Sequence, residues 1–217
     1  STTGKPDSTG SVGTAVEGAI KEVSELLDKL VKAVKTAEEA SSGTDAIGEV
    51  VDNAAAAKAA DKASVTGIAK GIKEIVEAAG GSEKLKAAAA ATGENNKEAG
   101  KLFGKVDAGN AGDSEAASKA AGAVSAVSGE QILSAIVKAA GEAAGDQEGK
   151  KPGEAKNPIA AAIGKGNADD GAEFGDGMKK DDQIAAAIAL RGMAKDGKFA
   201  VKSGGEKEKA EGAIKGA

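Results

Sequence analysis

The sequence predicts an all-α protein, an elongated bundle of many short Ala- and Gly-rich helices around one buried central helix, with long polar loops. Three observations predict this class. Alanine, the best helix former, is the most frequent residue, and proline occurs only 3 times. The 32 glycines favour many short helices over a few long ones. Aromatic residues make up only 1% of the chain, so closely spaced helices must build a core from Ile, Val, Leu and Ala.

The central helix is predicted within residues 178–202. An Asp-Asp pair at 181–182 suits a helix start, and an uncharged run follows it. On a helical wheel, Ile184 and Leu190 fall on nearly opposite sides, and a helix that is apolar on all sides is a buried helix. Residues 199–201 then predict a short extended segment.

Residues 1–13 are rich in Ser, Thr and Gly and predict a disordered N-terminal segment. The remaining chain, 14–217, is predicted to form a single helical domain. Its first helix starts with a capping box, Thr14 to Glu17. Ser and Gly residues at 41–43 end it.

Apolar residues in this first helix repeat at alternating steps of four and three, which is the spacing of a coiled-coil interface. We call this row the seam: Val16, Ile20, Val23, Leu27, Leu30, Val34 and Ala37. Two interpretations stay open. The seam packs within the helix's own domain, or it receives another helix, in a dimer or from chain ends outside this sequence.

Four helical segments are predicted next: 44–62, 64–79, 82–92 and 96–104. The first rests on an alanine run, and the second has an apolar face that stops at a Gly-Gly pair. Ser82 caps the third. The last is only a turn or two that buries Leu102 and Phe103.

The second half of the chain predicts further helices at 114–127, 128–140, 157–163 and from 206 onward. A second capping box, Ser128 to Gln131, opens one of them, and Asn157-Pro158 places proline at a first helical position. Three polar loops carry no helical periodicity and are expected to lie on the surface: 105–113, 145–156 and 164–177.

The composition excludes several classes of function. The 29 basic and 34 acidic residues are mixed along the chain and give a net charge of −5, which is not the basic face of a nucleic-acid-binding protein. The absence of His and Cys removes nucleophile–base pairs, zinc sites and disulfides. We therefore predict no enzyme activity, no catalytic residues and no cofactor.

Two acidic segments resemble calcium loops only superficially. Residues 107–112 have Gly109 and Ala111 where an EF-hand loop has oxygen ligands. The acidic residues at 169–176 are out of register for such a loop. We predict that both are solvated loops and that the chain has no metal site.

Four stretches resemble the variable major protein family of spirochaete surface lipoproteins: MKKDDQIAAAIALRGMAKDGKFAVK at 178–202, KGIKEIVEAAGGSEKLK at 70–86, GEQILSAIV at 129–137 and NPIAAAIG at 157–164. The resemblance covers essentially the whole chain. It implies a mostly helical, elongated, non-catalytic surface lipoprotein antigen that evades host antibodies. In this family a central cassette region is rewritten by gene conversion from silent cassettes.

The resemblance also explains an internal repeat. The sequence Glu-Gly-Ala-Ile-Lys occurs at 17–21 and again at 211–215, as short direct repeats flanking a cassette would. The chain is therefore expected to be the cassette region, truncated at both ends. Sequence change is expected in the three polar loops and on the helix faces near 52–62 and 86–98. It is not expected in the buried helices.

The implied partners are host antibodies and the outer membrane, reached on its extracellular face through a lipid anchor outside this chain. An adhesin for host matrix or glycosaminoglycan is the alternative function, with Lys150-Lys151 and Lys179-Lys180 as candidate contacts for sulfate groups. A weak homodimer through the seam is a further possibility.

Overall fold

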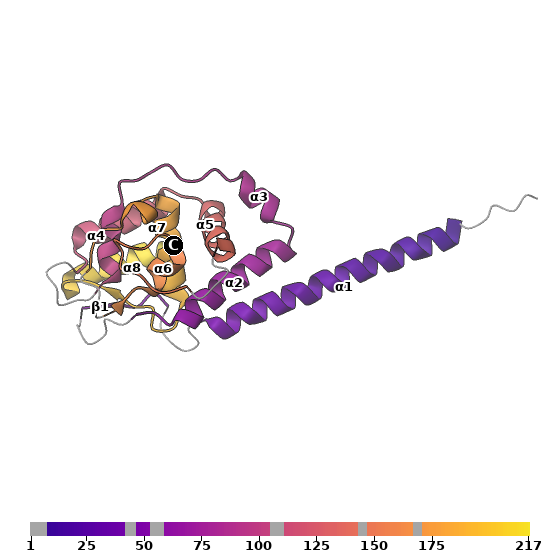
Figure 1. Ribbon diagram of the computed structural model, residues 1–217, viewed down its shortest axis with the longest axis horizontal. Helices are drawn as coiled ribbons and strands as arrows, with labels where there is room; N and C mark the ends of the chain where they lie inside the picture. The colour runs from indigo at the N-terminus through magenta and orange to yellow at the C-terminus, as the bar shows by residue number, and fades with distance from the viewer. Residues whose placement is uncertain (1–7, 42–46, 53–58, 105–110, 143–146, 167–170) are drawn as a thin grey trace, which may run out of the picture.

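Helices build most of the structure, which confirms the predicted all-α class. The computed structural model describes residues 8–41, 47–52, 59–104, 111–142, 147–166 and 171–217. One long helix, α1, extends away from a body that the other elements form (Figure 1). The molecule is therefore elongated, with its packed core at one end.

Helix α1 begins earlier than the sequence predicts. It spans Ser8–Ala40, 33 residues, or about 50 Å at a rise of 1.5 Å per residue. Residues 8–13 are thus helical, and the prediction of disorder through residue 13 is wrong for them; residues 1–7 lie outside the described part. The Thr14 hydroxyl donates to the Gly10 carbonyl oxygen at 3.0 Å, so Thr14 lies inside the helix and does not cap it.

Only the C-terminal part of α1 packs against the body, on α2 (Lys62–Ala78) (Figure 1). The two helices approach closely because Gly67 and Gly71 of α2 lie against Ala40 and Ala37, and a methyl group at either glycine would overlap them. The side chains of residues 10–29 are all exposed. The interpretation that the seam packs within its own domain is therefore wrong for most of its length.

Residues 47–52 form no helix, contrary to the helix predicted at 44–62. Strand β1 (Val50–Val51) pairs in parallel with β2 (Phe199–Ala200), far away in sequence. The Phe199 amide donates to the Glu49 carbonyl at 2.9 Å. Residues 42–46 and 53–58 lie outside the described part, and α2 starts only at Lys62 behind its cap, Asp61.

The helix predicted at 82–92 is also shorter than expected. Helix α3 covers only Ser82–Ala87, and residues 88–96 run without helical structure to the 3-10 helix η2 (Lys97–Phe103). In Figure 1 this connection arches over the body between α3 and α4. The turns expected at 96–104 are confirmed.

Four helices agree with the sequence, and the first three begin with local side-chain caps: α4 (Ser114–Ser125), α5 (Gly129–Glu142), α6 (Pro158–Ile163) and α8 (Gly204–Gly216). For α5 the predicted capping box is present, because the Ser128 amide donates to Gln131 Oε1 at 2.9 Å and the Gln131 amide donates to Ser128 Oγ at 3.2 Å. For α6 the Asn157 side chain accepts from the Ala160 amide at 2.9 Å. Helix α8 lacks a side-chain cap hydrogen bond.

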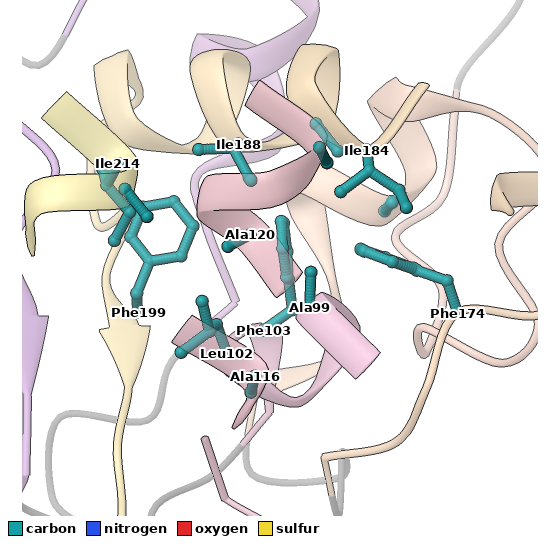
Figure 2. Close-up of a cluster of buried hydrophobic side chains, with 14 of the residues drawn as sticks. Ala99, Leu102, Phe103, Ala116, Ala120, Phe174, Ile184, Ile188, Phe199 and Ile214 are labelled. Atoms are coloured by element: carbon teal, nitrogen blue, oxygen red, sulfur yellow. The ribbon is translucent and has the colours of Figure 1, made fainter. Parts of the chain in front are cut away.

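Helix α7 (Asp181–Met193) is the predicted central helix, and it separates two hydrophobic clusters. On one side, Ile184 and Ile188 belong to the cluster that holds the three phenylalanines (Figure 2). On the other side, Ala186 and Leu190 join a cluster built with α2, α5 and α6. Helix α7 follows the 3-10 turn η4, Asp176–Met178.

Candidate functional site

The described residues contain no arrangement suited to metal chemistry. They hold no group of three or more His, Cys, Asp or Glu side chains that could bind an ion. Residues 107–110 and the aspartates at 169 and 170, which the sequence raised as calcium candidates, lie outside the described part. No described helix is by itself long and apolar enough to cross a bilayer; α4 and α5 pass that test only as a pair bent by 98°.

The polar loops combine buried anchors with exposed polar side chains. In the described part of the second loop, 147–156, Pro152 and Ala155 are buried while Lys150 and Glu154 are exposed. In the third, residues 171–177, Phe174 is buried against Phe103, with ring centroids 5.1 Å apart. Each loop is therefore fixed to the body at a few points and presents the rest of its side chains to solvent.

Main-chain contacts also join these loops to one another and to the body. The Gly175 amide donates to the Pro152 carbonyl at 3.2 Å, and the Phe174 amide donates to the Lys97 carbonyl at 2.9 Å. A Cβ on Gly175 would overlap the carbonyl of Gly153. The two loops and η2 therefore meet in a layer in which glycine permits close approach of backbones.

Arg191 of α7 is only 2% exposed. Its Nε donates to the Lys198 carbonyl at 2.8 Å, and its Nη1 donates to the carbonyls of Ala162 at 2.7 Å and Ile163 at 3.1 Å. The guanidinium also lies over the rings of Phe103 and Phe199, at 5.7 and 5.9 Å from their centroids. Arg191 thus ties the end of α6 and the segment before β2 to the central helix.

Sequence reasoning missed this role of Arg191. At the end of an apolar run, an arginine fits a helix C-terminus through the macrodipole alone. Its partners are carbonyl groups remote in sequence, and carbonyl groups leave no signature in residue types. A buried helix that carries a charged residue indicates that the charge is paired. The predicted burial of this helix, taken together with the charge of Arg191, was therefore the one available signal.

The aspartates at the start of α7 are buried as well. Asp181 is 3% and Asp182 7% exposed. Asp181 Oδ1 accepts from Asn96 Nδ2 at 2.8 Å, and Asp182 Oδ2 accepts from the Ala91 amide at 3.2 Å. The prediction that this pair marks the helix start is confirmed, since both lie in its first turn. Their attachment to residues 91–96 was not predictable from the local sequence.

Two of the lysines proposed for sulfate binding, Lys179 and Lys180, lie on a surface of mixed charge. Lys179 Nζ lies 3.2 Å from Glu94 Oε2. Lys179 and Lys180 border a cleft of about 360 Å³ whose wall also carries the acidic residues Glu142, Asp176 and Asp182. The mixed charge does not favour the adhesin alternative over a solvated face.

The sequence of the chain is similar to those of known proteins. The model of the Borrelia lipoprotein family matches residues 2–217. The chain is 39% identical over 201 residues to variable large protein 4 of Borrelia hermsii, a match that covers 91% of this chain and 55% of that protein. Variable large protein 17 of the same organism is 38% identical over 190 residues, covering 87% and 52%. The chain spans about half the length of these curated relatives.

A solved structure is similar throughout the body. The crystal structure of the Lyme disease variable surface antigen VlsE of Borrelia burgdorferi superposes with a TM-score of 0.86 at 84% identity, covering 94% of this chain and 73% of that one. This family of surface antigens is not a family of enzymes, which confirms the prediction of a non-catalytic protein. From the matched residues and the shared fold, the chain belongs to the Borrelia lipoprotein family and is a VlsE-related variable surface lipoprotein antigen.

Proposed function

We propose that this antigen evades host antibodies because its outward segments are replaced while its central helix is kept. The observation that carries the proposal is the contrast in exposure. Ile184, Ile188 and Leu190 of α7 are 0% exposed, whereas the described polar loops present their charged side chains to solvent. Substitution at solvated positions usually changes stability by no more than about 0.5 kcal/mol, so such positions tolerate replacement.

The proposed mechanism of replacement is gene conversion of a cassette. The repeated Glu-Gly-Ala-Ile-Lys sequence supports it, because its copies lie at 17–21 in α1 and 211–215 in α8, the first and last helices of the chain. If each end of the exchanged segment falls within a copy of this repeat, the residues of α1 and α8 at those ends stay the same after the exchange. All elements between them would be carried by the incoming sequence.

The location and partners follow from the same proposal. Membership of a lipoprotein family supports attachment to the outer membrane through a lipid anchor outside this chain, with the body on the extracellular face. Host antibodies are the proposed partners. They would contact the exposed loop segments and not α7.

Sequencing many clonal descendants after passage in an immune host tests this proposal. We expect clustered, templated changes in exposed segments such as 147–156 and 171–177, with the residues of α7 unchanged. Passage in a host without antibodies is the control, and it should yield few such clones. Changes scattered at single sites, or equally frequent in both hosts, would contradict it.

A further inference from the structure

Seven large apolar side chains form one exposed row along α1, which we call the outer stripe. Each of them is between 51% and 67% exposed. The members are Val12, Val16, Ile20, Val23, Leu27, Val31 and Val34. Contiguous exposed apolar surface on this scale marks an interaction site more often than it is left in water.

The outer stripe is not the face of α1 that contacts the body. It keeps five residues of the seam, but Val12 and Val31 take the places of the half-buried Leu30 and Ala37. Ala37 lies against α2. Val31 and Val34 are exposed in the same part of α1, so α2 covers a different side of the helix. The outer stripe is therefore open along its whole length, and Figure 1 shows α1 extending well beyond α2.

The spacing of the outer stripe suits a straight helix as the partner. Its members follow one another at steps of four, four and three residues, repeated twice. This is about 3.67 residues per turn, close to the 3.6 of an α-helix, so the row runs nearly parallel to the helix axis. From Val12 to Val34 it is about 33 Å long at a rise of 1.5 Å per residue.

Two opposite charges border the outer stripe on the same side of α1. Glu17 and Lys35 are 18 residues apart, which is about five full turns. Glu17 stands three residues before Ile20 and Lys35 four residues after Val31, and both spacings bring side chains together on a helix surface. This edge thus has an acid toward the N-terminus and a base toward the C-terminus. It is complementary to itself when a second copy runs in the opposite direction.

The charge of α1 does not favour a lipid surface as the partner. The helix carries four lysines and six acidic residues, so its net charge is −2. Helices that lie in a membrane interface are rich in Lys and Arg on their polar face. A protein partner of matching charge pattern fits better.

We propose that the outer stripe is the interface of an antiparallel homodimer, in which α1 of a second copy lies along it. In this arrangement Val16 faces Val34 of the second copy. Glu17 then lies within reach of Lys35 of the second copy, and the twofold symmetry forms this ion pair twice. The two bodies lie at opposite ends of the paired helices. The pairing obeys mass action, so α1 is uncovered in dilute protein.

Sedimentation equilibrium of the folded chain tests the dimer, at loading concentrations from about 1 µM to about 500 µM. We expect the mean mass to rise from 21.0 kDa toward twice that value. Val23→Glu with Leu27→Glu should stay monomeric throughout, because a carboxylate buried without a partner is costly. Its unfolding midpoint in dilute protein should equal that of the wild type, which shows that the body is folded. A wild-type chain that stays monomeric, or a double variant that dimerises as well as the wild type, would overturn the proposal.

A charge exchange tests the antiparallel direction. Glu17→Lys and Lys35→Glu should each raise the Kd of the dimer about three- to tenfold, because two attractive pairs become repulsive. Glu17→Lys and Lys35→Glu in one chain should restore the wild-type Kd. Glu25→Lys is the matched control, since Glu25 is nine residues from both Val16 and Val34 and so lies on the opposite side of α1. A combined variant that does not recover, or a control that weakens the dimer equally, would overturn the antiparallel pairing.

Cross-linking tests the direction independently, because the chain has no cysteine of its own. A Val16→Cys protein mixed with a Val34→Cys protein should form a mixed disulfide under mild oxidation. Neither should cross-link to itself, because about 27 Å of helix separates the like positions in the antiparallel dimer, far beyond the reach of a disulfide. Self-cross-linking as efficient as the mixed reaction would indicate parallel helices and overturn the proposal.

Vesicle binding tests the competing partner. The chain at about 1 µM, where the dimer dissociates, is mixed with phosphatidylcholine vesicles with and without phosphatidylglycerol. We expect it to stay in solution. Co-sedimentation with the vesicles that Val23→Glu with Leu27→Glu abolishes would assign the outer stripe to a lipid surface and overturn the dimer.

Discussion

At the residue scale, the stability of the body depends on side chains in α7 that have no exposed surface. Ile188 is 0% exposed in the cluster with Phe199. Ile188→Asp would bury an unpaired charge, and we expect thermal unfolding to show a loss of about 3–5 kcal/mol. Ile20→Asp makes the same chemical change at a site 64% exposed and should cost less than about 0.5 kcal/mol. Similar losses at both sites would contradict the central position of α7.

Arg191 contributes through hydrogen bonds that a lysine cannot reproduce. Arg191→Lys keeps the positive charge but offers one nitrogen to carbonyls that two guanidinium nitrogens now contact. We expect a loss of about 1–3 kcal/mol, the penalty of leaving one buried acceptor unpaired. Chemical denaturation measures this loss in the free energy of unfolding. Lys195→Arg, at an exposed position near the end of α7, is the control. An Arg191→Lys protein as stable as the wild type would show that the charge alone matters.

Asp113 gives the stability of α4 a dependence on pH. The Ala116 amide donates to its carboxylate at 2.9 Å, and this hydrogen bond lowers the pKa of Asp113 below its ordinary value. A carboxyl whose pKa is lowered by folding stabilises the protein above its unfolded pKa, and this contribution disappears as the pH falls through the folded pKa. We expect the advantage of wild type over Asp113→Asn in unfolding midpoint to shrink below about pH 4. A difference that stays constant with pH would contradict this.

At the element scale, the sequence was sufficient for the helices whose predicted caps form, although the capping box predicted at Thr14 lies inside α1 and does not start it. The Ser128 and Asn157 caps act within a few residues, so α5 and α6 appear where predicted. Prediction from the sequence failed where residues distant in the chain determine the structure. Residues 50–51 pair with 199–200, and residues 89–91 are hydrogen-bonded to α5 and α7. The local sequence pattern predicts neither contact.

Helix α1 combines a strong apolar period with side chains that are exposed throughout residues 10–29. A helix without packing is marginal in water, so this half should open far more often than α2. We expect limited proteolysis to cut within 10–29 first, while 62–78 resists. Val23→Glu with Leu27→Glu should leave the unfolding midpoint of the body unchanged. If both regions resist protease equally, another helix covers the seam.

At the scale of the whole molecule, the outward segments and the central helix should differ in access to antibodies. An antibody against a peptide of residues 178–202 should bind the denatured protein well and intact cells poorly, because α7 is buried. An antibody against 147–156 should bind intact cells and lose binding to sequence variants. Flow cytometry on live and on denatured cells compares them. Strong staining of live cells by the first antibody would contradict the burial of α7.

The position of α7 between two hydrophobic clusters has a consequence for cooperativity. Each cluster includes residues of the same helix, so neither can melt while the other keeps its native packing. The body should therefore populate few half-open states between native and unfolded, as expected for a two-state transition with equal calorimetric and van't Hoff enthalpies. Under the repeated sequence exchange proposed above, such cooperativity sets a sharp threshold of stability. A new variant either folds with both hydrophobic clusters packed or unfolds completely.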